Sequence, residues 1–324
     1  MGIRASFCAR LETWLNRSQT SFLPCYLKVL KPKNLVEIPT DIGRFTTLTV
    51  LDISNTSFVG TIPSEIGKLS RLERLRLSSA GVGLIGTIPT EIGSLTRLTQ
   101  LDLSSNHISG PIPSEIGLLS NLSYLDLSIN SFTGAIPTDL YSLTRLITLR
   151  LHGNSLTGTI PTTIGLLGNL SSLDLSFNDL TGTIPTEIAS TTHLTRLYLT
   201  GNQNLHGRLP SVLSRLSSSL LALDVGQNHL TGTIPTQWGQ LSRLTTLWLY
   251  ANDLTGSIPT QLGLLSHLTD IVLYGNHFTG SVQGIFCPWH FPTNNSASIQ
   301  HLWMDCTAVN CTCCTSCSCH GTIC

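Results

Sequence analysis

Three side chains with the composition of a nucleophilic triad recur at one spacing in the middle of the chain. Ser128, His152 and Ser176 are 24 residues apart, and an aspartate stands two residues before each serine. Serine, histidine and aspartate can form such a triad. Acyl transfer also needs an oxyanion hole and walls that exclude water, and strands stacked at this spacing form an open sheet that has neither. We therefore predict a non-enzymatic protein, in which Arg150 and the flanking aspartates form a charge ladder.

A second set of side chains, continuing the same columns toward the C-terminus, has the composition of a binding surface. Aromatic residues replace the small and acidic ones, and an arginine stands beside them. Exposed aromatics next to arginine are typical anchors of interfaces; the alternative is that aromatics simply favour strands. We predict no catalytic residue, metal ligand or cofactor. The predicted ligand-binding residues are Arg150, His152, Arg196, Tyr198, Trp248, Tyr250, Asp270 and Tyr274.

The ten cysteines are confined to the two ends of the chain. They are Cys8, Cys25, Cys287, Cys306, Cys311, Cys313, Cys314, Cys317, Cys319 and Cys324. In a reducing compartment the C-terminal group could bind Zn²⁺. We favour disulfides, because short segments that cover the ends of a repeat array have no core of their own. Their connectivity cannot be deduced from the sequence.

Disulfides imply an oxidising compartment, and N-glycosylation sequons fit the same location. We expect candidate N-glycans at Asn55, Asn121, Asn169 and Asn294. Residues 1–34 contain no signal-peptide pattern, so we expect a truncated or misassigned start. The alternative is myristoylation at Gly2 with palmitoylation at Cys8, which would place the protein in the cytosol. We predict a secreted or cell-surface protein.

The elements that position these residues are encoded by a sequence repeat. Residues 146–169 and 170–193 are two 24-residue copies, with leucine at positions 1, 4 and 6, asparagine at 9, an apolar residue at 11, glycine at 13 and Ile-Pro at 15 and 16. A fixed period of this length predicts a solenoid. The alternation at positions 3 to 7 predicts a strand with its leucines turned inward and positions 3, 5 and 7 facing solvent. Full repeats begin at Leu48, Leu72, Leu98, Leu122, Leu146, Leu170, Leu194, Leu220, Leu244 and Leu268.

From Leu98 to Gly280 these residues resemble the plant-type leucine-rich repeat, LxxLxLxxNxLxGxIPxxLGxLxx. The resemblance implies an α/β solenoid, a curved right-handed superhelix of about ten repeats with a concave parallel β-sheet and capped ends. It also implies a second short strand at LTGxIP and helical turns on the convex side. We expect an N-terminal cap segment at 1–34, the solenoid at 35–286 and a cysteine-rich C-terminal cap at 287–324, which resembles the ends of such proteins from diatoms and algae.

Composition narrows the class of partner. Only 11% of residues are charged and the net charge is zero, so the chain lacks the basic footprint of a nucleic-acid-binding protein. No apolar run approaches 18 residues, which predicts no transmembrane segment. The resemblance implies a role like that of a receptor ectodomain or a polygalacturonase inhibitor. We predict a protein, peptide or cell-wall glycan ligand on the concave face.

The alternative function is ice binding. Positions 12 and 14 flank the repeat glycine and should both point outward, which gives a Thr-x-Thr ladder. Such ladders resemble the ice-binding faces of β-helical antifreeze proteins, although LTGxIP also favours threonine for its strand propensity. Its members are Thr157 and Thr159, Thr181 and Thr183, Thr231 and Thr233, and Thr255 and Ser257.

Overall fold

The computed structural model describes residues 20–23, 26–29, 36–55, 58–79, 83–286, 299, 301–305, 309–310, 318–319 and 322–323. The side chains of all ten cysteines lie outside the described residues, so the disulfides and the zinc alternative stay predictions. The chain divides into two compact units, residues 1–156 and 157–324. Each unit is described by itself, and the predicted domain boundaries stay predictions.

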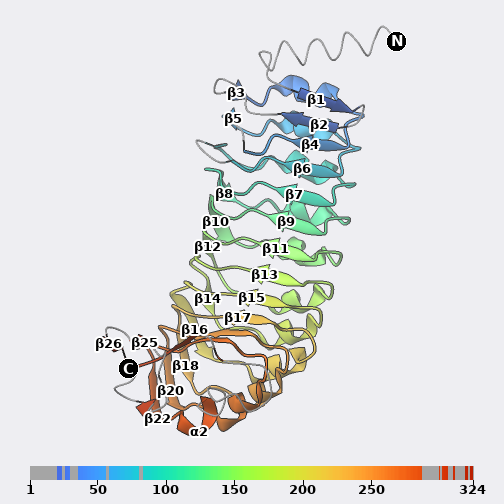
Figure 1. Ribbon diagram of the computed structural model, residues 1–324. Helices are drawn as coiled ribbons and strands as arrows, with labels where there is room; N and C mark the ends of the chain where they lie inside the picture. The colour runs from blue at the N-terminus through green and yellow to red at the C-terminus, as the bar shows by residue number, and fades with distance from the viewer. Residues whose placement is uncertain are drawn as a thin grey trace. The chain divides into compact units, whose positions relative to one another are not determined.

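Unit 1 is built on a sheet in which parallel strands follow one another in chain order (Figure 1). The strands are β1 (Thr20–Leu23), β2 (Tyr26–Val29), β4 (Val50–Asp52), β6 (Arg74–Arg76), β7 (Gln100–Asp102), β9 (Tyr124–Asp126) and β11 (Thr148–Arg150). Only β1 is antiparallel, pairing with β2 as a hairpin. Equivalent repeat positions stand opposite each other, as Asp126 does to Asp102 and Arg150. The predicted columns of side chains are therefore confirmed in this unit.

Unit 2 has the same construction. Its strands are β13 (Ser172–Asp174), β15 (Arg196–Tyr198), β17 (Ala222–Asp224), β19 (Thr246–Trp248), β21 (Asp270–Val272), β23 (His301–Trp303), β25 (Ser318–Cys319) and β26 (Thr322–Ile323). The strands run parallel from β13 to β25, and β26 turns back antiparallel. Strand β23 comes from beyond the last predicted repeat, yet it continues the register, with Trp303 opposite Val272.

A second row of short parallel strands follows the repeat asparagines. In unit 1 these are β3 (Val36–Glu37), β5 (Phe58–Val59), β8 (Ser109–Pro111) and β10 (Ser131–Ala135), and β12 (Ser155–Thr157) contains the boundary between the units. In unit 2 they are β14 (Thr181–Gly182), β16 (Asn204–Arg208), β18 (His229–Gly232), β20 (Asp253–Ser257), β22 (His277–Ser281) and β24 (Val309–Asn310). The second strand that the resemblance implied is present.

The helical turns that the resemblance implied are short 3₁₀ helices, each beginning directly after a proline. Unit 1 has η1 (Thr40–Arg44), η2 (Ser64–Lys68), η3 (Thr90–Ser94), η4 (Ser114–Leu118) and η5 (Thr138–Ser142). Unit 2 has η6 (Thr162–Leu166), η7 (Thr186–Ser190), η8 (Ser211–Leu216), η9 (Thr236–Gln240), η10 (Thr260–Leu264) and a turn of α-helix, α2 (Gln283–Phe286). The proline supplies an extended residue before the helix, and i→i+3 bonds such as Ile66 N–H to Pro63 O (3.0 Å) tighten it.

The core of each unit is filled by the apolar repeat positions. Leu170, Leu173 and Leu180 have no exposed surface. Trp238, at the core position of η9, is also 0% exposed and its indole N–H donates to Pro210 O at 3.1 Å. One side chain of this size contributes about 2 kcal/mol on burial, too little to order a whole repeat alone. Each repeat therefore depends on its neighbours to cover it.

The repeat asparagines hold the turn that joins the two rows of strands. Asn202, which has no exposed surface, donates its amide to Leu175 O (3.1 Å) and Leu199 O (2.9 Å). Its Oδ1 accepts the N–H of Leu180 at 3.2 Å. The amide thus satisfies backbone groups of its own repeat and of the preceding one, as the sequence predicted.

The prediction that positions 3, 5 and 7 all face solvent is wrong for several of their short members. Asp126 and Asp224 are only 5% and 4% exposed, and Ser128 and Thr200 are buried as well. Such an aspartate folds back on its own strand: Asp126 Oδ1 accepts the N–H of Ser128 at 3.1 Å and its hydroxyl at 2.5 Å.

Candidate ligand-binding surface

The C-terminal strands of unit 2 bring four of the predicted ligand-binding residues together in two contacting pairs. Trp248 on β19 and Asp270 on β21 are joined by a hydrogen bond from the indole N–H to Asp270 Oδ1 at 3.1 Å. The rings of Tyr250 and Tyr274 lie 5.4 Å apart between centroids at an angle of 31°. All four side chains are half-buried. This spacing lies within the range of favourable aromatic pairs, so the rings form a fixed surface.

Tyr250 lies flat on the sheet because the neighbouring repeat has no side chain at the equivalent position. A Cβ built on Gly226 would lie 2.3 Å from a ring carbon of Tyr250, so the ring covers this glycine. The ring extends past it until the hydroxyl reaches Thr200 Oγ1, 3.2 Å away and two strands along. Gly226 is therefore part of the site, although it offers no side chain to a ligand.

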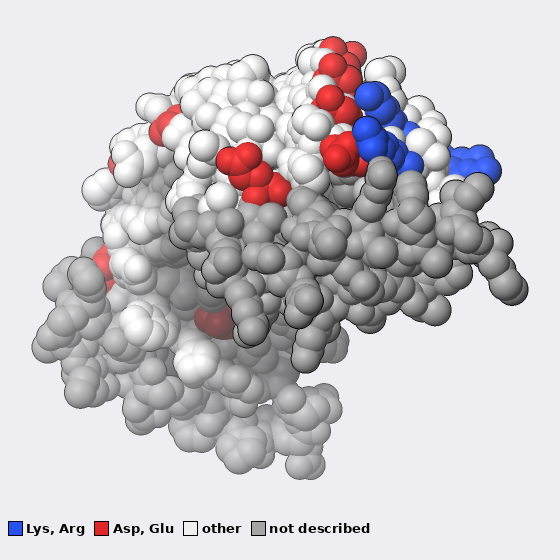
Figure 2. Space-filling view, turned by 90° about the horizontal axis from the view of Figure 1, so that it is seen from above, with Lys and Arg blue, Asp and Glu red and all other residues white. Residues whose placement is uncertain are grey.

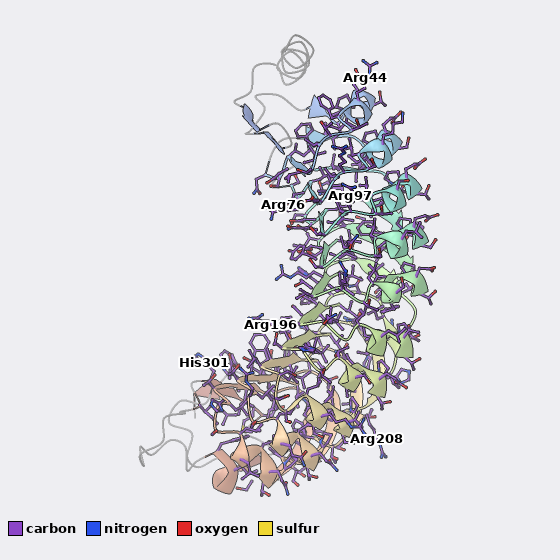
Figure 3. The ribbon with its side chains drawn as sticks, turned by 90° about the vertical axis from the view of Figure 1, so that its right-hand side faces the viewer. Arg44, Arg76, Arg97, Arg196, Arg208 and His301 are labelled. Atoms are coloured by element: carbon purple, nitrogen blue, oxygen red, sulfur yellow. The ribbon has the colours of Figure 1, made fainter. Side chains whose placement is uncertain are left out.

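Arg196 and Tyr198 extend the aromatic surface along β15. Arg196 is exposed and its guanidinium donates to the Tyr198 hydroxyl. Burial raises the pKa of Tyr198, Arg196 lowers it, and Asp174 and Asp224 raise it, so the phenol stays protonated at neutral pH. In Figure 3, Arg196 and His301 lie on the sheet side of unit 2, whereas Arg208 lies away from it.

Asp224 is a buried residue that lies between two of these aromatic residues in the sheet. Strand register places it opposite Tyr198 on β15 and Trp248 on β19. Its Oδ1 accepts the N–H of Gly226 at 2.9 Å, and the Thr200 hydroxyl also donates to it. Burial raises the pKa of Asp224 to about 6, the Gly226 N–H opposes this rise, and the charge of Asp174 adds to it. A titratable carboxyl group therefore lies beneath the rings.

The other two predicted residues, Arg150 and His152, belong to unit 1. Arg150 Nη1 lies 3.5 Å from Asp126 Oδ2 and 3.2 Å from the Tyr124 hydroxyl, and its guanidinium carbon is 5.9 Å from the centre of the Tyr124 ring. The Tyr124 hydroxyl donates to Asp126 Oδ2 at 3.0 Å. Burial and Asp126 raise the pKa of Tyr124 to about 12. Arg150 is thus held by an ion pair and a cation–π contact, and the predicted pairing with Asp126 is confirmed.

His152 follows β11 and is half-buried. Its backbone carbonyl accepts the N–H of Ile129 at 2.7 Å. The nearby Asp126 carboxylate is already bonded to Ser128, Tyr124 and Arg150.

Besides Gly226, three contributors to the surface were not among the predicted residues. Trp303 on β23 is 44% exposed and stands opposite Val272, and Asp305 accepts the N–H of Gly275 at 2.7 Å. Asp224 is the third. The spacing of Leu302 and Met304, both buried, reproduces repeat positions 4 and 6, and this signal could have revealed β23 from the sequence.

Charged residues make up only 11% of the chain. Figure 2 shows them gathered in small groups with wide uncharged areas between them. Among the residues that the structure describes, no group of three His, Cys, Asp or Glu side chains could hold a metal ion. In the same part of the chain, no helix has the length and apolar character needed to cross a membrane.

The threonine ladder occupies a different surface, along the second row of strands in unit 2. Every member is exposed except Thr181, which is half-buried, and the exposed His206 and Arg208 interrupt the ladder. The methyl groups of the threonines at position 14 also lie close to the glycine of the next repeat. A Cβ on Gly182 would lie 2.9 Å from the Cγ2 methyl of Thr159, and one on Gly256 would lie 2.8 Å from that of Thr233. Packing between repeats is therefore one physical reason for threonine here.

The repeats are also evident from comparison with known proteins. Residues 47–69, 97–119, 121–143 and 144–205 match sequence models described as leucine rich repeat. A plant ice-binding protein of known structure is 33% identical, with a TM-score of 0.61 over 72% of each chain. The chain belongs to the leucine-rich repeat family. None of the curated proteins matches this leucine-rich repeat chain.

Plant receptors with leucine-rich repeats are also similar. The structure of a TDR receptor is 33% identical with a TM-score of 0.76, over 84% of this chain and 45% of that one. The Arabidopsis receptor kinase HAESA, solved in complex with the peptide hormone IDA and the co-receptor SERK1, is 35% identical with a TM-score of 0.72, over 78% of this chain and 42% of that one. The chain therefore spans less than half the length of these receptor chains.

Proposed function

We propose that this leucine-rich repeat chain is a non-enzymatic recognition module that binds a protein, peptide or cell-wall glycan on the sheet face of unit 2. The observation that carries the proposal is the set of half-buried rings of Tyr198, Trp248, Tyr250 and Tyr274, held in place by Asp270 and Thr200. Rigid aromatic side chains bury much surface on binding at little cost in conformational entropy.

The resemblance to plant receptors supports a peptide or protein ligand in particular. HAESA was solved with a peptide hormone and a co-receptor bound to it. The same resemblance supports a secreted or cell-surface location. Of the proposed glycan sites, Asn55 and Asn169 are exposed and Asn121 is half-buried. None of them lies at repeat position 3, 5 or 7, so glycans there would leave the sheet face free.

The test is a double substitution, Trp248→Ala with Tyr250→Ala, measured by selection from a display library of random peptides. Wild-type protein is expected to enrich a peptide family that the double variant does not retain, because two of the four rings are missing. The melting temperature should change little, since both side chains are half-buried on the sheet surface. Equal retention of the peptides by the double variant would move the site away from this face.

A second candidate, ice binding, is favoured by one observation: the exposed threonine ladder of unit 2, together with the likeness to a plant ice-binding protein over 72% of each chain. Ice recrystallisation in the presence of micromolar protein tests it. If the ladder binds ice, Thr183→Lys with Thr233→Lys should abolish inhibition and the Trp248→Ala, Tyr250→Ala variant should retain it. Unhindered recrystallisation with wild-type protein would eliminate this candidate.

A further inference from the structure

Buried carboxylates at repeat position 5 have different neighbours in the two units: arginine in unit 1, and an aromatic residue in unit 2. In unit 1, Asp52 lies 3.8 Å from Arg76 Nη1, and Asp126 lies 3.5 Å from Arg150 Nη1. In both cases the arginine stands in register on the next strand. Each of these carboxylates therefore has a cation from the protein itself, as buried charges generally require.

Asp224 has the same repeat position and the same burial, but the residue in register on the next strand is Trp248. No Lys, Arg or His side chain of the described residues forms an ion pair with it. Its bonds to the Gly226 N–H and the Thr200 hydroxyl are neutral. The raised pKa, caused first by burial and increased by Asp174, agrees with a carboxylate that lacks a counter-charge.

The side chains around Asp224 are those that favour a cation. Tyr198 and Trp248 flank it on the adjacent strands, and the Tyr250 ring covers Gly226 beside it. The faces of aromatic rings attract ammonium and guanidinium groups, most strongly where water is partly excluded. A ligand cation over these ring faces would be attracted by the rings and also by the Asp224 carboxylate beneath them.

We infer that the sheet face of unit 2 binds a peptide through one of its Arg or Lys side chains, which is placed over Tyr198, Trp248 and Tyr250 with Asp224 as its counter-charge. This inference rests on the proposed recognition function and names the ligand chemistry of the same surface. A neutral glycan could stack on the rings but would leave the carboxylate uncompensated. A metal ion would need several oxygen ligands, whereas the groups around Asp224 are mostly aromatic carbon.

The first test uses small probes and the indole N–H signals of the protein labelled with ¹⁵N-tryptophan. Propylguanidinium is expected to shift the Trp248 signal in a saturable manner, whereas propylurea, which has a similar shape and no charge, is not. Trp248→Phe assigns the signal. Asp224→Asn should weaken the response to propylguanidinium at least tenfold, and Asn can still accept the Gly226 N–H, so that the fold is kept.

The matched control is Asp126→Asn, which removes a carboxylate of equal burial that already has Arg150 beside it. It should leave the response to propylguanidinium unchanged. An equal response to propylurea, or an Asp224→Asn variant that responds like the wild type, would overturn the inference.

The peptide library separates this inference from the function on which it rests. Peptides selected by the wild type should carry Arg or Lys at one shared position, and Asp224→Asn should select without that preference. Selected peptides that lack a basic residue but are lost in the Trp248→Ala, Tyr250→Ala variant would keep the recognition function and overturn the cationic ligand. Binding of a neutral oligosaccharide that is independent of Asp224 would overturn it as well.

Discussion

Asp224 is held as a buried carboxylate at a free-energy cost that depends on pH. Its folded-state pKa of about 6 lies above the ordinary value of 3.8, so the folded protein binds more protons than the unfolded chain between these values. The contribution of Asp224 to stability is therefore most favourable below the unfolded pKa and falls as pH rises through about 6. A shift of two pKa units corresponds to about 3 kcal/mol.

Asp224→Asn removes this penalty, because the amide has no charge to bury. We predict that the variant is more stable than the wild type at pH 7.5 by about 1–3 kcal/mol, and that the difference shrinks toward zero at pH 4. Urea unfolding of both proteins at the two pH values measures it. The control, Asp126→Asn, should lose stability at pH 7.5, because it breaks the pair with Arg150. A stability difference for Asp224→Asn that is the same at both pH values would contradict the prediction.

At the residue scale, the sequence predicted which columns face outward but not which side chains stay accessible there. Trp248, Tyr250 and Tyr274 were assigned to the surface from their repeat positions alone. The Tyr250 ring crosses Gly226, two residues after Asp224, and reaches Thr200 two strands away. Such a contact depends on rotamers and on a missing side chain in the next repeat, and repeat position encodes neither.

At the scale of the element, the asparagine turn connects the two rows of strands and stabilises both. The Asn202 amide completes bonds to Leu175 O, Leu199 O and the N–H of Leu180. We predict that Asn202→Ala destabilises the protein by about 2–5 kcal/mol, because it leaves several buried backbone groups unpaired. Chemical denaturation measures the loss. The control Gln203→Ala, at an exposed neighbouring position, should change stability by less than about 0.5 kcal/mol.

How well each element could be predicted depends on how many of the repeat residues its segment carries. Strands and asparagine turns were predicted wherever the repeat carries its full set of residues, and the resemblance implied the helical turns. Strands β2 and β23 were not predicted. The segment of β2 lacks the asparagine turn, although Ile38-Pro39 follows it, and the segment of β23 lacks both the asparagine turn and the Ile-Pro pair. They pair in register nevertheless, Tyr26 with Val50 and Trp303 with Val272. A strand needs only a neighbouring edge and alternate apolar residues to join a parallel sheet, so pairing extends beyond the recognisable repeats.

At the scale of the whole molecule, the repeat architecture makes stability local. Among the described residues, backbone pairing joins each strand of the main sheet to the strands beside it, so stability is close to a sum over repeats and their interfaces. The proposed binding surface can then vary from repeat to repeat without disturbing distant ones. In unit 2 the column that begins with Asp174 continues with Tyr198, Asp224 and Trp248 on a core of leucines and Val225.

This locality is measurable with a core substitution in one repeat of unit 2. Leu199 has no exposed surface and follows strand β15, so Leu199→Ala removes about 2–5 kcal/mol of packing free energy. We predict that amide hydrogen exchange quickens most in β15, next in its partners β13 and β17, and little in β21, because the lost contacts belong to one repeat and its interfaces. Mass-spectrometric exchange of peptides that cover these strands resolves the order. Uniform acceleration across all four strands would instead mean that unit 2 opens as one cooperative body.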